Sequence, residues 1–312
     1  MSINKASRFY LFGLLLILVM YVVATKFVSH LTQRDRERKD KLQVVTSFYP
    51  LYFFAREIGG EQVQVDNITP VGSEPHDYEP TTRDISQIER ASLLIINGAH
   101  LESWADKVKD NQRTSNVRII EVSQGLATQE IEEGAKKIQD PHIWLDPILA
   151  KRQVEIILGG FVDIDREHKT IYENNARKLI KKLDLLDKAF KEGLKDCAQK
   201  NIVTSHAAFG YVASRYNLIQ IPISGLSPDE EPSPKRLAEI AKFTRTNHVK
   251  YIFFETLISP KLAETIAREV GAKTIVFNPL EGLTQEQQSK AQDYFSIQRD
   301  NLSNLRTALE CK

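Results

Sequence analysis

One long amphipathic segment divides this chain into two halves, and it limits the folds that the chain can adopt. Across residues 167–197, apolar side chains recur at helical spacing, and no proline or glycine interrupts the pattern before Gly193. This period predicts a single helix of roughly 45 Å, at about 1.5 Å per residue. A helix of that length exceeds the width of one ordinary domain, so we expect it to join two folded lobes.

Short hydrophobic runs alternate with helical patterns on both sides of this segment. The predicted strands are 42–48, 63–69, 92–98 and 117–123 in the first half, and 201–206, 218–224, 251–255 and 274–277 in the second. The alternation predicts an α/β fold with two lobes, each a parallel-type sheet flanked by helices, and one final helix from about Gln285. We expect lobes at 42–165 and 198–312, joined by one long rigid helix at 166–197 that restricts hinge bending.

Residues 1–41 read as a signal or membrane anchor followed by a charged spacer. Lys5 and Arg8 precede an apolar run from Phe9 to Ala24, whose length lies between a signal-peptide core and a membrane span. The charged flank that follows favours an uncleaved anchor over a cleaved signal. Both interpretations predict an extracytoplasmic protein, in the periplasm or at the cell surface, that is membrane-anchored or secreted.

The charge balance and the two cysteines narrow the possible partners and the compartment. Lys and Arg number 42 and Asp and Glu number 41, so the chain lacks the basic excess typical of nucleic-acid binding. In an exported protein, Cys197 and Cys311 allow one disulfide, which would tie the last helix to the start of the second lobe. Two free thiols are the alternative.

Four candidate metal ligands lie just past strand-like runs: His76 in SEPHDYEP, His142 in QDPHIWLDP, His206 in IVTSHAAFGY and Glu281 in VFNPLEGLT. In open α/β sheets, ligands bind beyond the carboxyl ends of the strands. Three neutral imidazoles and one carboxylate suit a tetrahedral Zn²⁺. Because these groups fill all four positions, whereas catalytic zinc keeps one open for water, the pattern favours holding an ion over catalysis.

Several neighbouring residues could be mistaken for parts of a site. Asp146 before Pro147 is expected to cap a helix, and Ser205 lacks the Gly-x-Ser-x-Gly turn of a hydrolase. Glu255 ends a predicted strand, where it could accept a hydrogen bond from a ligand histidine. Equally, it could cap a helix or be a buried, paired acid. The histidines without a matching motif, which we do not expect to be ligands, are His30, His100, His168 and His248.

The motifs PVGSEPHDYEPT, DPHIWLDP, TSHAAFGY and NPLEGLT, in this order on two lobes, resemble the zinc-specific solute-binding proteins of metal ABC transporters. That family includes zinc-binding lipoproteins described as adhesins, and the resemblance covers the chain from Leu42 onward. It implies Zn²⁺ clamped between the lobes by His76, His142, His206 and Glu281, one pair from each lobe. It also implies a non-enzymatic protein that delivers zinc to an ABC permease in the membrane, and we expect this protein to be a monomer. Because the ligands come from both lobes, removing the metal should loosen the contact between the lobes.

The chain departs from this family in two places. Many zinc-binding relatives carry a histidine-rich loop where residues 127–140 contain no histidine, so we expect no metal-collecting loop. Many also have aspartate at the position of Asn278, and Glu281 is expected to take its place. The manganese branch typically has a carboxylate at the third position, which here is His206. Alternatives are a manganese- or iron-binding transport protein, a zinc-containing surface adhesin, and an extracellular zinc hydrolase, although no HExxH helix occurs.

Overall fold

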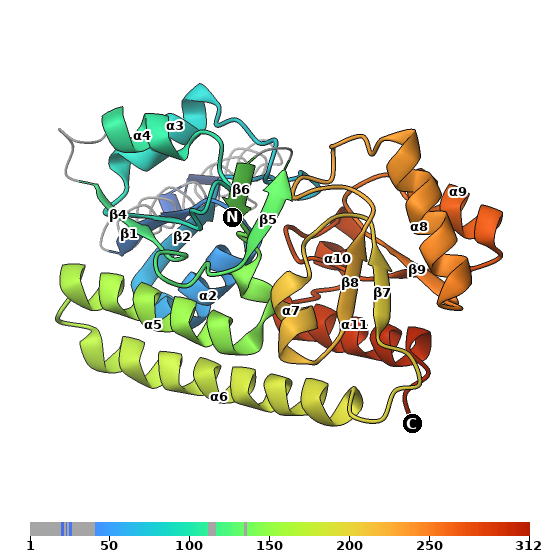
Figure 1. The fold of residues 1–312 in the computed structure, drawn as a ribbon. Helices are drawn as coiled ribbons and strands as arrows, with labels where there is room; N and C mark the ends of the chain where they lie inside the picture. Colours follow the sequence, from blue (N-terminus) through green and yellow to red (C-terminus); the bar gives the residue numbers. More distant parts are fainter. Residues whose placement is uncertain (1–19, 22, 24, 27–40, 112–116, 134–135) are drawn as a thin grey trace, which may run out of the picture. The chain divides into compact units, whose positions relative to one another are not determined.

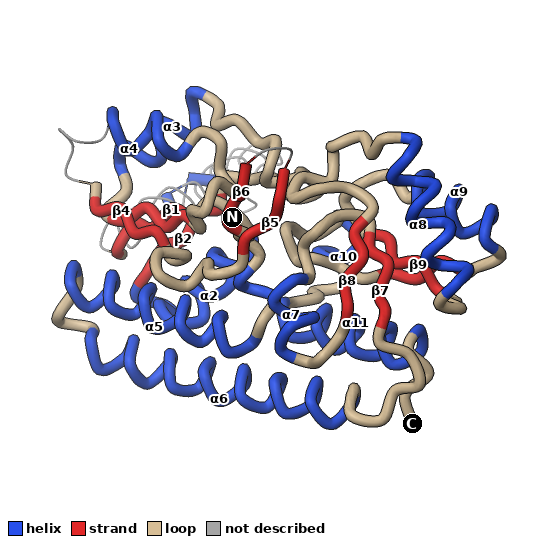
Figure 2. Tube along the Cα trace, viewed as in Figure 1, coloured by secondary structure: helices blue, strands red, loops and turns tan. Residues whose placement is uncertain are grey.

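Two four-stranded sheets, one in each half of the chain, organise the computed structural model (Figure 1, Figure 2). The structure describes residues 20, 21, 23, 25, 26, 41–111, 117–133 and 136–312. The predicted anchor and spacer, including His30, lie almost entirely outside the described residues. Within the described part of the chain, no helix has both the length and the apolar character needed to cross a membrane.

The first sheet has the strand order β2-β1-β3-β4, with parallel neighbours. Its strands are β1 (Leu42–Thr46), β2 (Val63–Asn67), β3 (Leu93–Ile96) and β4 (Arg118–Glu121). All four residues of β3 are buried, as expected for a strand covered on both faces. The helical elements of this half are α2 (Tyr49–Gly59), η1 (Gly60–Gln62), α3 (Thr82–Arg90), α4 (Ala105–Asn111) and α5 (Pro147–Ile164).

The second sheet has the order β10-β9-β7-β8 and is also parallel. Its strands are β7 (Asn201–Thr204), β8 (Ile219–Pro222), β9 (Tyr251–Phe254) and β10 (Lys273–Val276). The helices of this half are α7 (Gly210–Arg215), α8 (Pro234–Thr246), α9 (Lys261–Val270), α10 (Gln285–Ser289) and α11 (Tyr294–Ala308). The α/β prediction with two parallel sheets is confirmed.

The single final helix predicted from Gln285 is wrong, because the chain breaks it into α10 and α11. Ala291 adopts a left-handed conformation with φ of 51°, which a continuous helix does not allow. Asp293 then caps α11, because its side chain accepts the backbone N–H of Ser296 at 2.7 Å. A strong local start signal therefore outweighs the helical propensity of the residues before it.

The long helix α6 (Lys169–Gly193) lies beneath both halves (Figure 1). It packs against α5 and α2 of the first half and against α11 of the second. Its buried side chains keep the predicted helical spacing, so the long linking helix is confirmed. Residues Gln43–Lys312 form one compact unit, and the lobe limits near 165 and 197 stay predictions.

A small antiparallel hairpin that the sequence did not reveal lies before His142. It pairs β5 (Glu130–Glu133) with β6 (Lys136–Gln139). His142 therefore follows a hairpin, not a hydrophobic strand of the sheet, and the short turn η3 (Ile143–Leu145) comes next. Asp146 then accepts the backbone N–H of Ile148 at 2.8 Å, which confirms its predicted role as the cap of α5.

Cys197 and Cys311 form a disulfide across 114 residues, which confirms the bridged alternative. The two residues also pair as an antiparallel bridge, and the N–H of Lys312 donates to the carbonyl of Asp196 at 3.0 Å. The end of the chain is thereby tied to the segment that leads into β7.

Candidate metal centre

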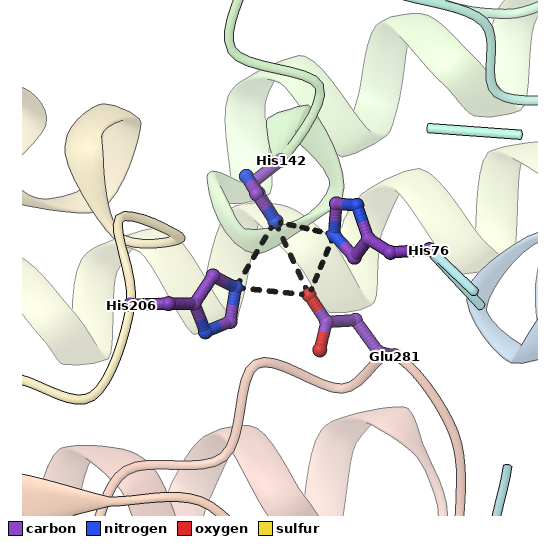
Figure 3. A group of neighbouring side chains, drawn as sticks. All are labelled: His76, His142, His206 and Glu281. Carbon is purple, nitrogen blue, oxygen red and sulfur yellow. Dashed lines mark hydrogen bonds and ion pairs between the residues drawn. The ribbon is translucent and has the colours of Figure 1, made fainter. Parts of the chain in front are cut away.

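Three histidines and one glutamate from four separate segments bring one ligand atom each to a common point (Figure 3). His76 lies in the loop between β2 and α3, His142 precedes η3, His206 follows β7 and Glu281 follows β10. These atoms all lie within 4.8 Å of one another. The structure therefore brings together the complete set of residues that the motifs predicted.

Five of the six separations between these atoms match the edges of a tetrahedron of the size that zinc requires, and the sixth, between His76 and His206, is at most 4.8 Å. His142 Nε2 lies 3.2 Å from His76 Nε2, 3.3 Å from His206 Nε2 and 3.2 Å from Glu281 Oε1. Glu281 Oε1 lies 3.5 Å from His76 Nε2 and 3.3 Å from His206 Nε2. A zinc ion about 2.0–2.1 Å from each of four ligand atoms would hold them about 3.3–3.4 Å apart. The four residues could therefore hold such an ion with little rearrangement.

The site is shielded from water and has the electrostatics of a cation pocket. The side chains of His142, His206 and Glu281 are 0% exposed, and that of His76 is 9% exposed. The second carboxylate oxygens of Glu281 and Glu74 are buried without a hydrogen-bond partner. Burying a carboxylate oxygen without a donor is unfavourable unless a cation compensates for it. The arrangement therefore favours binding of a positive ion.

Carboxylates orient two of the histidines. His142 Nδ1 lies 2.7 Å from Asp140 Oδ1, and His206 Nδ1 lies 2.7 Å from Glu255 Oε1. A carboxylate on one ring nitrogen sets the tautomer in which the other nitrogen can bind a metal. Of the two interpretations of Glu255 that the sequence left open, the structure therefore supports the acceptor from a ligand histidine.

Asp140 and Glu74 take part in the site although the sequence analysis did not single them out. Asp140 precedes His142 by two residues, and its carboxylate also accepts the backbone N–H of His142 at 3.0 Å. Glu74 precedes His76 by two residues and accepts its backbone N–H at 3.3 Å. Burial and the charge of Glu281 raise the pKa of Glu74 to about 10. In both cases an acid two positions before a candidate ligand was the available signal.

Without a metal ion, the four candidate ligands differ in the direction in which their pKa values are shifted. Burial lowers the pKa of His76. Burial also disfavours the protonated forms of His142 and His206, but the neighbouring carboxylates outweigh this effect. The pKa of His142 is therefore raised, and that of His206 is raised well above its usual value. For Glu281, burial would raise the pKa, but the charge of His206 and hydrogen bonds from the histidines hold it well below its usual range.

Within the described part of the chain, the residues that we did not expect to be ligands lie outside this group. His100 and His248 are exposed, and His168 Nδ1 pairs with Asp165 Oδ2 at 2.8 Å in the turn between α5 and α6. Ser205 donates its hydroxyl to the carbonyl of Phe253 at 3.3 Å. A hydroxyl engaged in that way is not paired with a general base, as nucleophilic catalysis requires.

Comparisons with known proteins agree with this geometry. The family model described as zinc-uptake complex component A, periplasmic, matches residues 44–308. The high-affinity zinc uptake system protein ZnuA of Bacillus subtilis is 37% identical over 312 residues, which cover 96% of this chain and 98% of that protein. The zinc-binding lipoprotein AdcA of Streptococcus pneumoniae is 38% identical over 87% of this chain, which spans only 56% of that longer protein.

Solved structures show the same similarity in three dimensions. The crystal structure of the Zn(II)-bound ZnuA-like domain of S. pneumoniae AdcA matches with a TM-score of 0.76 and 38% identity, covering 86% of this chain and 99% of the domain. The laminin-binding protein Lmb of Streptococcus agalactiae, described as bifunctional with adhesin and metal transporting activity, matches with a TM-score of 0.77 and 34% identity. That match covers 86% of this chain and 99% of Lmb.

Proposed function

We propose that this chain, which belongs to the zinc-uptake complex component A family, captures Zn²⁺ outside the cytoplasm and delivers it to an ABC-type permease. The ligands in this proposal are His76, His142, His206 and Glu281. The observation that carries it is that five of the six ligand-atom separations are 3.2–3.5 Å, close to the edges of a zinc tetrahedron. The relatives named for zinc uptake and zinc binding support the same ion.

Transport suits this ligand set better than catalysis. Four protein ligands leave no position for the water that a zinc hydrolase activates. The ligand set is also too rich in nitrogen for manganese, which prefers carboxylate and carbonyl oxygen. We therefore propose neither an enzymatic activity nor manganese transport for the chain, and no feature of the described residues leads us to propose adhesion.

The proposed place of action follows from the relatives and from the N-terminal sequence. Relatives are named as periplasmic components or as lipoproteins, which supports an extracytoplasmic protein. We propose that the apolar run 9–24 exports the chain and anchors it, and that it acts as a monomer beside its permease. The disulfide is compatible with an oxidising compartment.

The test is metal analysis of the full chain purified without added metal, together with a zinc titration against a competing chelator. We expect one tightly held zinc per chain. Glu281→Ala should keep that stoichiometry and lower the affinity, because three nitrogen ligands remain but the only ligand charge is lost. The matched control is Glu286→Ala, which removes an exposed carboxylate paired with Lys290 and should leave affinity unchanged.

The outcomes separate the parts of the proposal. A wild-type chain that binds no zinc, or binds it no better than a variant without the three histidines, refutes the function. Wild-type binding with unchanged affinity in Glu281→Ala would move the fourth position to water or to another acid, such as Glu74, whose carboxyl group interacts with that of Glu281.

A further inference from the structure

The short helix α7 of the second lobe docks onto the segment that carries His142. This segment, residues 140–146, connects the hairpin to α5 and is called the ligand segment below. Tyr211 of α7 contacts its first residue, Asp140, and Arg215 of α7 contacts its last residue, Asp146. The TSHAAFGY motif therefore supplies more than His206, because its final tyrosine reaches the neighbouring ligand of the other lobe.

The Tyr211 hydroxyl donates one hydrogen bond and accepts another at the base of the hairpin formed by β5 and β6. It donates to the carbonyl of Asp140 at 2.9 Å and accepts the backbone N–H of Gln129 at 3.2 Å. The N–H of Asp140 donates to the carbonyl of Gln129 at 2.9 Å, which closes the same base. Tyr211 is 3% exposed, and burial raises its pKa to about 12, so the hydroxyl keeps its proton as a donor.

Asp140 links this hydroxyl to the metal centre. Its backbone carbonyl accepts from Tyr211, while its carboxylate accepts from both the backbone N–H and Nδ1 of His142. His142 Nε2 in turn lies 3.2–3.3 Å from the ligand atoms of the other three candidates. A shift of Asp140 would therefore change three edges of the ligand tetrahedron at once.

We propose that Tyr211 is a positioning residue for zinc binding, which holds Asp140 and through it His142 in register with the ligands of the second lobe. This inference rests on the proposed function. The Tyr211 hydroxyl belongs to the second lobe, whereas the ligand that it positions, His142, belongs to the first.

Gly210 provides an independent way to perturb the same contact. A Cβ at this position would lie 2.9 Å from Asp140 Oδ2 and 2.7 Å from Gln129 Oε1. The Gln129 side chain can turn away, but the Asp140 carboxylate is held by His142. Gly210→Ala should therefore push Asp140 and α7 apart, although alanine is the better helix former.

The experiment measures zinc affinity by chelator competition in the full chain, together with the absorption bands of bound Co²⁺, which report the geometry of a tetrahedral site. Tyr211→Phe removes only the hydroxyl. We expect affinity to fall about three- to tenfold, since outer hydrogen-bond partners of metal ligands typically contribute 10–100-fold and this one acts one bond further away. The Co²⁺ bands should shift in the same variant.

Tyr216→Phe is the matched control. Tyr216 directly follows α7, is 6% exposed and donates its hydroxyl to Asp187 Oδ1 of α6 at 3.2 Å, not to a residue of the ligand segment. The control should keep wild-type affinity and wild-type Co²⁺ bands. If it weakens binding as much as Tyr211→Phe does, a general loosening of α7 explains both effects and the inference is overturned.

The remaining outcomes are also decisive. If the wild type binds zinc and Tyr211→Phe matches it in affinity and in Co²⁺ bands, the inference fails while the proposed function stands. If the wild type binds no zinc, both fail. Should Tyr211→Phe not fold, Gly210→Ala decides the question: it is expected to weaken zinc binding, and unchanged affinity would overturn the inference.

Discussion

Zinc binding should release about one proton per ion near neutral pH, because the free site holds protons that the ion must displace. Burial acts against protonation of His206, but the charges of Glu255 and Glu281 raise its pKa well above the usual value. Burial likewise acts against protonation of His142, and hydrogen bonds to Asp140 and Glu281 raise its pKa. Among the four candidate ligands, these two rings are therefore the groups that carry protons in the free site.

The other two ligands should contribute no protons in this range. Burial lowers the pKa of His76, so this ring is already neutral at pH 7. The pKa of Glu281 lies well below its usual value, because the charge of His206 outweighs the effect of burial. Glu281 is therefore already ionised, and it would lose its charge only in strong acid.

The size of the pH effect follows from how the two protonated rings interact. The Nε2 atoms of His142 and His206 lie 3.3 Å apart, so two positive rings would repel each other and the pair titrates in two steps. Zinc needs the unprotonated rings, so affinity is highest above the raised pKa and falls as the pH drops through it. Displacing one proton weakens binding about tenfold per pH unit, or about 100-fold between pH 7.5 and 5.5.

Two measurements check this expectation. Chelator competition across the pH range gives the slope of affinity, and calorimetry in buffers of different ionisation enthalpy counts the protons released. Glu255→Gln keeps the size of the side chain but removes a charge that raises the pKa of His206, so it should reduce the proton count and flatten the slope. Equal zinc affinity at pH 7.5 and 5.5, with no proton release, would refute the histidine site.

Three further outcomes are expected. Replacing Cys197 and Cys311 by serine should lower the free energy of unfolding by about 4–5 kcal/mol in urea titrations with chelator present, because the bridge closes a loop of 114 residues; an effect below about 1 kcal/mol would contradict this. Trp144→Phe leaves the Pro279 carbonyl without the N–H that donates to it at 2.7 Å, so the same assay should show a loss of about 1–3 kcal/mol. Deleting residues 9–24 should leave the chain in the cytoplasmic fraction of expressing cells, and continued export would contradict the anchor.

Much of the fold could be predicted because the physical signals are local. Apolar runs such as 92–98 lie between helical patterns, and one uninterrupted amphipathic segment has no other solution than a long helix. The hairpin at 130–139 could not be predicted in this way, since five of the eight residues in its two strands are charged and they form no apolar run. The backbone bond between Gln129 and Asp140 closes its base, and Tyr211, which holds that base, comes from a distant position in the chain.

The site shows the same division between local and distant information. The four ligand candidates could be named because each lies in a short motif, and their common placement beyond strand-like runs suggested a shared centre. His142 does reach that centre, but it follows a hairpin and not, as had been expected, a strand of the parallel sheet. The role of Glu255 stayed open because only its distance of 2.7 Å from His206 Nδ1 separates an acceptor from a capping acid.

Some contacts between the two lobes do not involve the metal, and they limit how far its loss can loosen the lobes. The second lobe holds the ligand segment through hydrogen bonds that involve no ligand side chain. Trp144 donates to the carbonyl of Pro279 and accepts from the Tyr294 hydroxyl at 2.6 Å through its own carbonyl, and Gln298 donates to the carbonyl of Leu145. Hydrogen bonds of this kind contribute about 0.5–1.5 kcal/mol each, and they do not depend on the ion. Whatever the metal adds to the contact between the lobes, it therefore adds to an interface that these backbone carbonyls and aromatic side chains already define.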